Sequence, residues 1–394
     1  MEERLNFLMQ AAAGQESISA LCREFGVSRQ SAYRLLKRAK SEGLKAALPR
    51  SRRPLTSPQA LSAEQVLEIV SIRVAHPRWG AKKIRAILEG VNPGQNVPAQ
   101  RTINRVLERT GLVEKRRRRG GRRYYPEKVI RPVVANEVWT IDVKGWWCTK
   151  DGKRCYPLTI RDEHSKFILD IAALSEVTAE AVKRRLLLCF KRYGLPRYIR
   201  SDNGAPFCAA TAVQGLSTLA VWWIELGILP NRIPKASPQY NGGHERMHRD
   251  MKAELQLTPA RDIKLQQRIF DAWRHQYNYE RPHEALKMKR PGDCYSPSST
   301  TLPNREAAYR YGEPVQVRRV GLRGEIWWRG KRFFLSNALH RKNIGIKEEE
   351  NQLYSLWFKN FFLGKTDFRF KSSPVRGKTV EETKRCKVSP MSWH

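Results

Sequence analysis

The sequence lacks paired cysteines and is short of acidic residues. Its seven cysteines are scattered and form no Cys-x-x-Cys pair, which argues against a disulfide framework or a zinc ribbon and is typical of a reducing compartment. Only 38 acidic residues oppose 74 lysines and arginines, so the formal net charge is +36. A solvated surface does not need that excess, whereas a polyphosphate partner explains it through counterion release. We therefore expect a nucleic-acid partner.

Targeting and membrane signals are also missing. The N-terminus lacks the basic region and apolar run of a signal peptide. The largely apolar stretch 207–229 contains Gln214, Ser217, Thr218 and Glu225, so a buried amphipathic helix is favoured over a membrane span. With 394 residues, 41% of them hydrophobic, the chain is long and apolar enough for several folded domains. These features predict a soluble, cytoplasmic, globular protein.

Two N-terminal segments have helix-turn-helix patterns. Residues 17–38 have a possible N-cap at Ser17, a break at Gly26 and a second helix after Ser28. Residues 62–112 begin with a Ser62–Gln65 capping box and end with a polar-sided helix at 99–110. Both are interpreted as DNA-binding modules, with an ordinary helical hairpin as the alternative. The predicted DNA contacts are Ser28, Arg29, Gln30 and Arg34 in the first module, and Arg101, Thr102, Asn104 and Arg105 in the second.

Composition shifts divide the whole chain into modules and linkers. The run 115–123 has seven basic residues in nine positions, and Arg116, Arg117, Arg118 and Arg119 are expected to lie along DNA phosphates. Strand-like segments followed by alternating helices predict an α/β unit with a mixed sheet, and short strands near the C-terminus predict a small β-barrel. The predicted bounds are 1–45 and 61–113 for the helical modules, 46–60 and 114–132 for basic linkers, 133–295 for the α/β core, 296–312 for a linker, 313–370 for the β-barrel and 371–394 for a basic disordered tail.

Three carboxylates are the candidate catalytic and metal-binding residues. Asp142 lies in a β-branched and aromatic run, Asp202 ends a second strand-like run before an Asn-Gly turn, and Glu245 opens a helix. A strand, a strand end and a helix start each supply one hard oxygen ligand. Such a set can clamp two Mg²⁺ ions roughly 3.5–4 Å apart for in-line displacement at phosphorus.

The neighbouring residues of the helix favour Glu245 over other acids. At roughly 100° per residue, Arg249 and Lys252 fall within about 40° of Glu245 and are suited to phosphates, whereas Asp250 and Glu254 point elsewhere. Residues 244–248 also match the zinc-protease pattern H-E-x-x-H, but that interpretation explains neither the net charge nor the other two carboxylates.

Other polar residues near these motifs are given structural roles. Asp162, Glu163 and His164 are expected in a hairpin turn, and Asp170 at an outward strand position. Arg281 and His283, at the end of a helix, are expected to brace the fold, with DNA contact as the alternative.

As a set, these motifs resemble bacterial insertion-sequence transposases of the DDE class, whose catalytic core is similar to that of retroviral integrases. The resemblance runs over nearly the whole length. One departure is the spacing of 42 residues between Asp202 and Glu245, which indicates an insert within 207–229. The matching segments are Phe25–Ser28, Arg50–Pro54, Arg78–Gly80, Trp139–Asp142, Ser201–Gly204, Ser237–Pro238, Asn241–Gly242, Glu245–Arg246, Asn278, Arg281–His283 and Ala285–Leu286.

The resemblance implies a fold, a cofactor and an activity. The core would have the RNase H-like fold, and Asp142, Asp202 and Glu245 would bind two Mg²⁺ or Mn²⁺ ions. The protein would bind the terminal inverted repeats of its element, cleave DNA and transfer a strand into target DNA, as at least a dimer in the nucleoid. The alternatives are a sequence-specific DNA-binding protein with an inactive core and a structural DNA binder without sequence preference.

Overall fold

The computed structural model describes residues 2–49, 60–113, 130–209, 212–233, 242–256, 258–304, 308–350 and 353–366. The chain folds into two compact units, residues 1–67 and 68–394. None of the described helices is long and apolar enough to cross a membrane. The predicted tail 371–394, residues 50–59 and 114–129 of the two basic linkers, and with them Arg116–Arg119, lie outside the described residues.

The first unit contains the predicted helix-turn-helix, preceded by a further helix. Ser17 and Ser28 cap their helices by accepting hydrogen bonds from the backbone N–H groups of Ala20 and Ser31. Gly26 takes a positive φ of 61° in the turn, which a residue without Cβ adopts without strain. Phe7, Leu21, Cys22 and Ala32 form a small apolar core. The elements are α1 (Glu2–Ala13), α2 (Ile18–Glu24), α3 (Arg29–Glu42) and the 3-10 helix η1 (Gly43–Ala47).

The second helical module consists of α4 (Ala63–Ala75), α5 (Ala81–Val91) and α6 (Gln100–Arg109). The predicted capping box is confirmed, because Ser62 and Gln65 each accept a hydrogen bond from the backbone N–H of the other. Trp79 in the turn between α4 and α5 is buried and stacks on His76 with ring centroids 3.6 Å apart. This stack fixes the turn that carries Arg78.

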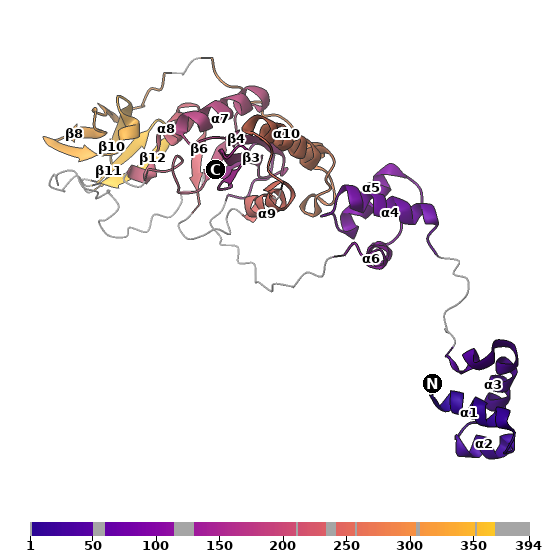
Figure 1. The fold of residues 1–394 in the computed structure, drawn as a ribbon. Coiled ribbons are helices and arrows are strands. Elements are labelled where there is room, and N and C mark those ends of the chain that lie inside the picture. Colours follow the sequence, from indigo (N-terminus) through magenta and orange to yellow (C-terminus); the bar gives the residue numbers. More distant parts are fainter. Residues whose placement is uncertain are drawn as a thin grey trace. The chain divides into compact units, whose positions relative to one another are not determined.

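A mixed six-stranded sheet forms the centre of the core, as predicted (Figure 1). Its path is β2-β3-β1-β5-β6, with β4 paired to β3. The pairs β1–β3 and β3–β4 are antiparallel, and β1–β5 and β5–β6 are parallel. The strands are β1 (Val138–Val143), β2 (Trp147–Cys148), β3 (Arg154–Asp162), β4 (Ile168–Leu174), β5 (Tyr198–Ser201) and β6 (Leu229–Arg232).

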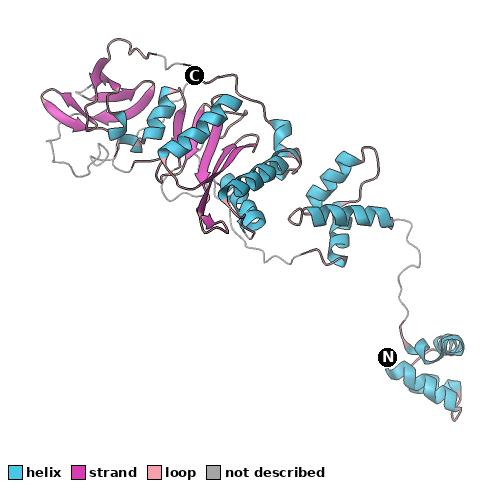
Figure 2. Cartoon of the chain, turned by 45° about the horizontal axis from the view of Figure 1, so that its top comes forward, coloured by secondary structure: helices cyan, strands magenta, loops and turns pink. Residues whose placement is uncertain are grey.

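Helices cover both faces of this sheet (Figure 2). One apolar cluster joins β1 and β3 to α7 (Ala179–Tyr193) and α8 (Thr218–Glu225). The other joins β4 to α9 (Gly242–Met251) and α10 (Ile263–Tyr279). The π-helical turn η4 (Lys252–Gln256) continues α9, and η5 (Glu284–Leu286) and η6 (Pro291–Cys294) follow α10. The sheet is therefore buried between two helical layers.

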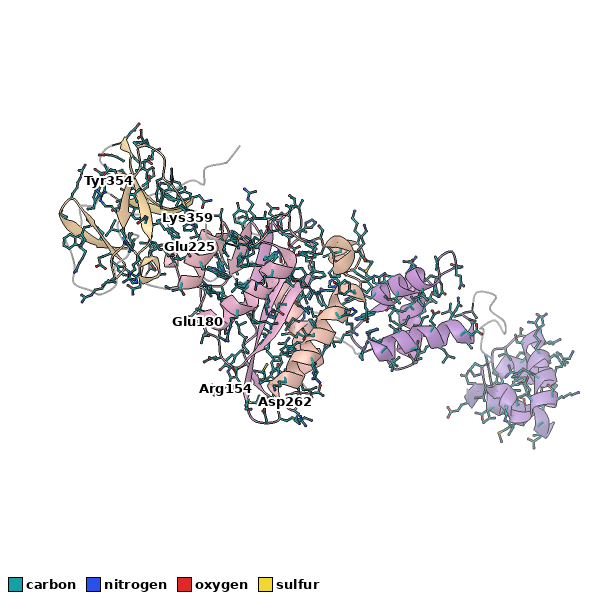
Figure 3. The ribbon with its side chains drawn as sticks, turned by 90° about the horizontal axis from the view of Figure 1, so that it is seen from above. Arg154, Glu180, Glu225, Asp262, Tyr354 and Lys359 are labelled. Atoms are coloured by element: carbon teal, nitrogen blue, oxygen red, sulfur yellow. The ribbon has the colours of Figure 1, made fainter. Side chains whose placement is uncertain are left out.

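The sequence predicted one amphipathic helix in the apolar stretch 207–229, and this prediction is wrong. The stretch contains the short 3-10 helix η2 (Val213–Gly215) and α8, which begins only after the N-cap Ser217. Part of its apolar surface is covered by the C-terminal strands. The backbone N–H of Val213 donates to the carbonyl of Leu335 at 2.8 Å, and Lys359 Nζ to that of Glu225 at 3.2 Å (Figure 3).

The C-terminal strands do not form the predicted barrel. Four of them make an open antiparallel sheet in the order β12-β11-β10-β7, and β8 and β9 form a separate hairpin. In the described part of the chain the edge strands β7 and β12 each pair on one side only, so the sheet does not close. The elements are β7 (Gln316–Arg319), β8 (Glu325–Trp328), β9 (Lys331–Phe334), η7 (Asn337–Leu339), β10 (Asn343–Glu348), β11 (Tyr354–Phe358) and β12 (Phe361–Thr366).

Candidate active site

Asp142 is placed near the end of β1 by its neighbours on both sides. In register it lies opposite Thr159 of β3, while preceding residues of β1 pair with β5. Trp139 and Ile141 anchor the strand in the apolar core, with exposed fractions of 0% and 1%. The Asp142 side chain is 21% exposed, so it lies at the boundary between the core and solvent.

Asp202 directly follows β5, the parallel neighbour of β1. Because parallel strands end at the same edge of a sheet, Asp202 is brought toward Asp142. Its Oδ1 accepts a hydrogen bond from the backbone N–H of Gly204 at 3.1 Å, and the Asn203 side chain donates to the carbonyl of Ile233 at 2.7 Å. These bonds hold the Asp-Asn-Gly turn, and Asp202 itself is exposed.

Glu245 is exposed in the first turn of α9. Met247 and Met251 bury the opposite side of this helix in the apolar cluster with β4 and α10. The start of α9 also needs glycine, since a Cβ at Gly243 would clash with the guanidinium of the buried Arg161. The predicted helix start and the exposure of Glu245 are both observed.

The charges of Asp202 and Glu245 act on Asp142. Burial raises the pKa of Asp142 to about 7, and the negative charges of Asp202 and Glu245 act in the same direction. A hydrogen bond from the Val143 backbone and the charge of Lys144 act in the opposite direction without cancelling the shift. Asp142, Asp202 and Glu245 are called the carboxylate cluster below, and Asp142 holds its proton more strongly there than an ordinary aspartate does.

His248 of α9 lies beside Asp142 in the structure. The sequence indicated this residue only as part of the H-E-x-x-H pattern. Its Nε2 lies 2.8 Å from the hydroxyl oxygen of Thr159, and its Nδ1 lies 3.6 Å from Asp142 Oδ2. Since the Thr159 hydroxyl donates to the Asp142 carbonyl at 3.0 Å, it accepts from His248, and the proton is assigned to Nε2. Nδ1 then faces the carboxyl group as an acceptor. Burial lowers the pKa of His248 to about 3, so the ring is neutral near pH 7.

The competing acids of the same helical segment are paired with arginines, which the sequence did not indicate. Arg281 pairs with Asp250, and its Nη1 lies 3.7 Å from Glu254. Arg78 from the turn after α4 lies 3.9 Å from Asp250 and 3.8 Å from Glu254. The Trp273 indole N–H donates to Glu254 at 2.6 Å. Arg281 therefore braces the fold, as predicted.

The position predicted for Asp170 is wrong. It is 4% exposed and accepts hydrogen bonds from Arg185 at 2.6 and 2.7 Å. Because helices cover both faces of the sheet, β4 has no outward side. Asp162, Glu163 and His164 do lie at the predicted hairpin turn, where Asp162 accepts from the backbone N–H of Asn136 and Ser165.

The described side chains do not form a preassembled metal site. Among the residues that the structure describes, no group of three or more His, Cys, Asp or Glu side chains is placed to hold one. The zinc-protease interpretation gains no support, because His248 instead faces Thr159 and Asp142. The carboxylates do fit hard divalent cations chemically, because a cation would stabilise the charged form of Asp142 against the burial and the neighbouring negative charges that raise its pKa.

The predicted DNA-contacting side chains are mostly on exposed helix positions. Ser28 is exposed too, but its hydroxyl caps α3, and Arg29 donates a hydrogen bond to Ser19. Thr102 is partly buried. The exposed members are Arg29, Gln30 and Arg34 on α3, Arg101, Asn104 and Arg105 on α6, Arg249 on α9 and Lys252 on η4.

Models of known domain families match several segments of this chain. Two integrase core domain models match residues 133–238 and 226–291. A helix-turn-helix domain model matches residues 3–54, and a homeodomain-like domain model matches residues 31–107. The core matches cover the elements that bear Asp142, Asp202 and Glu245.

Similar proteins come from insertion elements. The "Insertion element IS407 uncharacterized 31.7 kDa protein" of Burkholderia multivorans is 27% identical over 58% of this chain and 80% of its own length. The "Insertion element IS476 uncharacterized 39.2 kDa protein" of Xanthomonas euvesicatoria is 26% identical over 66% of this chain and 71% of its own length. A solved HTLV-2 integrase catalytic core domain, in complex with magnesium, is 14% identical over 42% of this chain and 99% of its own, with a TM-score of 0.32. The chain therefore carries helix-turn-helix domains and an integrase core domain, and it is related to proteins of insertion elements.

Proposed function

We propose that this protein is a DDE transposase that binds the terminal inverted repeats of an insertion sequence, cleaves DNA beside them and joins the ends to target DNA. The observation that carries the proposal is the electrostatic coupling of Asp142 with Asp202 and Glu245, which come from three separate elements of an integrase core domain. A carboxyl group whose pKa is raised by burial and by neighbouring negative charges is characteristic of a functional site.

Asp142, Asp202 and Glu245 would hold two Mg²⁺ or Mn²⁺ ions. Bound there, the ions would activate the attacking oxygen and stabilise the leaving oxygen of an in-line displacement. In this proposal the three side chains move together around the ions when these bind. Thr159 holds the backbone carbonyl of Asp142, and the neutral imidazole ring of His248 packs beside its carboxyl group. No side chain forms a covalent bond with DNA in this scheme.

The basic residues supply DNA binding in this proposal. Arg249 and Lys252, exposed on the segment that bears Glu245, would contact phosphates beside the carboxylates. The exposed polar side chains of α3 and α6 would read the inverted repeats. Joining two ends requires at least a dimer on DNA, and chromosomal DNA as substrate implies action in the cytoplasm, at the nucleoid.

A strand-transfer assay tests this proposal. Oligonucleotides copied from the DNA flanking the gene are incubated with protein in Mg²⁺ or Mn²⁺, and joined product is measured. We expect product with wild type and with Glu180→Gln, a matched exposed control on α7, but not with Glu245→Gln. End-specific binding by wild type without cleavage or joining would contradict the proposal and favour a DNA-binding protein with an inactive core.

A further inference from the structure

Trp146 is an exposed aromatic side chain in the turn between β1 and β2. It is 50% exposed, whereas its neighbour Trp147 is buried in a T-shaped contact with Phe270. The guanidinium carbon of Arg154, an exposed residue at the start of β3, lies 4.5 Å from the centre of the Trp146 ring. Trp147 supplies the packing of this turn, so the apolar core does not require an indole at position 146.

The surroundings of Trp146 carry excess positive charge. Hydrogen bonds from the backbone N–H groups of Lys150 and Asp151 to residues 260 and 261 join the β2–β3 hairpin to the loop before α10. Figure 3 shows Arg154 and Asp262 at this same end of the sheet. Segments 144–154 and 259–264 contain six basic and two acidic residues. Both acids have local partners, since Asp151 accepts from the Thr149 hydroxyl and Asp262 caps α10. The surface therefore favours a polyanion.

The position of Trp146 relates this surface to the candidate active site. It lies four positions after Asp142 in the chain, so their Cα atoms are at most about 14 Å apart. A base inside a duplex is already stacked on both faces, whereas an unpaired base has a free face for an aromatic ring. An exposed indole with cations around it, this close to a cleavage site, fits a single-stranded DNA end better than an intact duplex.

We propose that Trp146 and Arg154 form a platform on which an unpaired base at a DNA end stacks, with the neighbouring lysines contacting its phosphates. The identity of the nucleic acid rests on the proposed function. The platform adds a specific role, which is to prefer ends that have lost base pairing near Asp142.

Equilibrium binding in EDTA tests the platform without requiring catalysis. Fluorescence anisotropy compares a blunt duplex with the same duplex bearing a short 3′ single-stranded extension. We expect wild type to bind the extended duplex about tenfold more tightly, as one base–aromatic stack provides. Trp146→Ala should remove this preference and leave blunt-duplex affinity within about twofold, while Trp146→Phe should keep most of it. An abasic extension, which keeps the phosphates, should remove the preference in wild type.

Trp327→Ala is a matched control, because Trp327 on β8 is a similarly exposed tryptophan (64%). It should retain the wild-type ratio of the two affinities. An unchanged ratio in Trp146→Ala, an equal loss of affinity for both duplexes, or no preference in wild type would each overturn the platform. The strand-transfer assay fails or succeeds independently of this ratio, so the two proposals can be separated.

Discussion

The segment formed by α9 and η4 carries acidic side chains in two contrasting environments. Asp250 and Glu254 are matched by two arginines, Arg281 and Arg78, and by the indole N–H of Trp273. Glu245, one turn earlier, belongs instead with two further carboxylates, and its charge helps to raise the pKa of Asp142. One helical segment thus joins acids paired with arginines, the compensated cluster, to the carboxylate cluster.

This difference separates structural charges from functional ones. A compensated cluster stabilises a folded arrangement, whereas like charges held together cost stability and persist where a function needs them. The arginine cluster also fixes the segment that bears Glu245 against α10, because Arg281 follows that helix. Neutralising the first cluster should therefore change stability, and neutralising the second should change activity.

The largest effect is expected for Asp142→Asn in the carboxylate cluster. Loss of one carboxylate removes several kcal/mol of transition-state stabilisation, so cleavage and joining should fall on the order of a thousandfold. The measurement is the rate of strand transfer with the flanking ends, with EDTA as the metal-free reference. DNA affinity should stay near that of wild type. Strand transfer at a wild-type rate would show that Asp142 is not catalytic.

The next effect is on folding and concerns Arg281→Ala in the compensated cluster. The Arg281 side chain is only 7% exposed, so its removal leaves Asp250 and Glu254 partly buried and poorly paired. We expect a loss of about 3–5 kcal/mol in the free energy of unfolding, measured with urea. Adding Asp250→Asn and Glu254→Gln should recover part of it. A loss below about 1 kcal/mol would show that the cluster does not stabilise the fold.

The pH dependence of stability should reveal the raised pKa of Asp142 directly. The folded value of about 7 lies above the ordinary value of 3.8, so between these pH values the folded protein holds a proton that the unfolded chain has lost. The free energy of unfolding contributed by Asp142 therefore falls as pH rises from about 4 to about 7, by a few kcal/mol and at most about 4.

The measurement is the difference in unfolding free energy between wild type and Asp142→Asn across this pH range without divalent metal. As pH rises, the variant should become more stable relative to wild type, and Mg²⁺ should stabilise wild type more than the variant. Parallel curves for the two proteins would mean that Asp142 has an ordinary pKa in the folded state.

Local sequence patterns were sufficient to predict the elements that bear the carboxylates. The β-branched run around Asp142, the Asn-Gly turn after Asp202 and the glycines before Glu245 each act over a few residues, and the structure has the strand, turn and helix expected there. The buried environment of Asp170 could not be predicted in this way, because it depends on helices from distant parts of the chain covering both sheet faces.

Long-range pairing limits the rest of the prediction. The position of His248 against Asp142 depends on how α9 packs over β3, and a helix or strand pattern carries no such information. The alternation of apolar and polar residues in the C-terminal segment identified several strands, but closure of a barrel depends on whether the edge strands pair with each other. The docking of Leu335 on the 207–229 segment is likewise a contact between residues far apart in sequence.

The smallest effect is expected for Arg78→Ala, and it tests how far the compensated cluster depends on its second arginine. Arg78 is 30% exposed and lies 3.8–3.9 Å from its acidic partners, near the limit of an ion pair, whereas Arg281 is in closer contact with Asp250. Screening by water should limit the loss to less than about 1 kcal/mol, measured in the same urea titration. A double-mutant cycle with Asp250→Asn isolates the pairwise energy. If Arg78→Ala cost as much as Arg281→Ala, the two arginines would be equal members of the cluster, and the turn after α4 would be as important as α10 for holding the segment that bears Glu245.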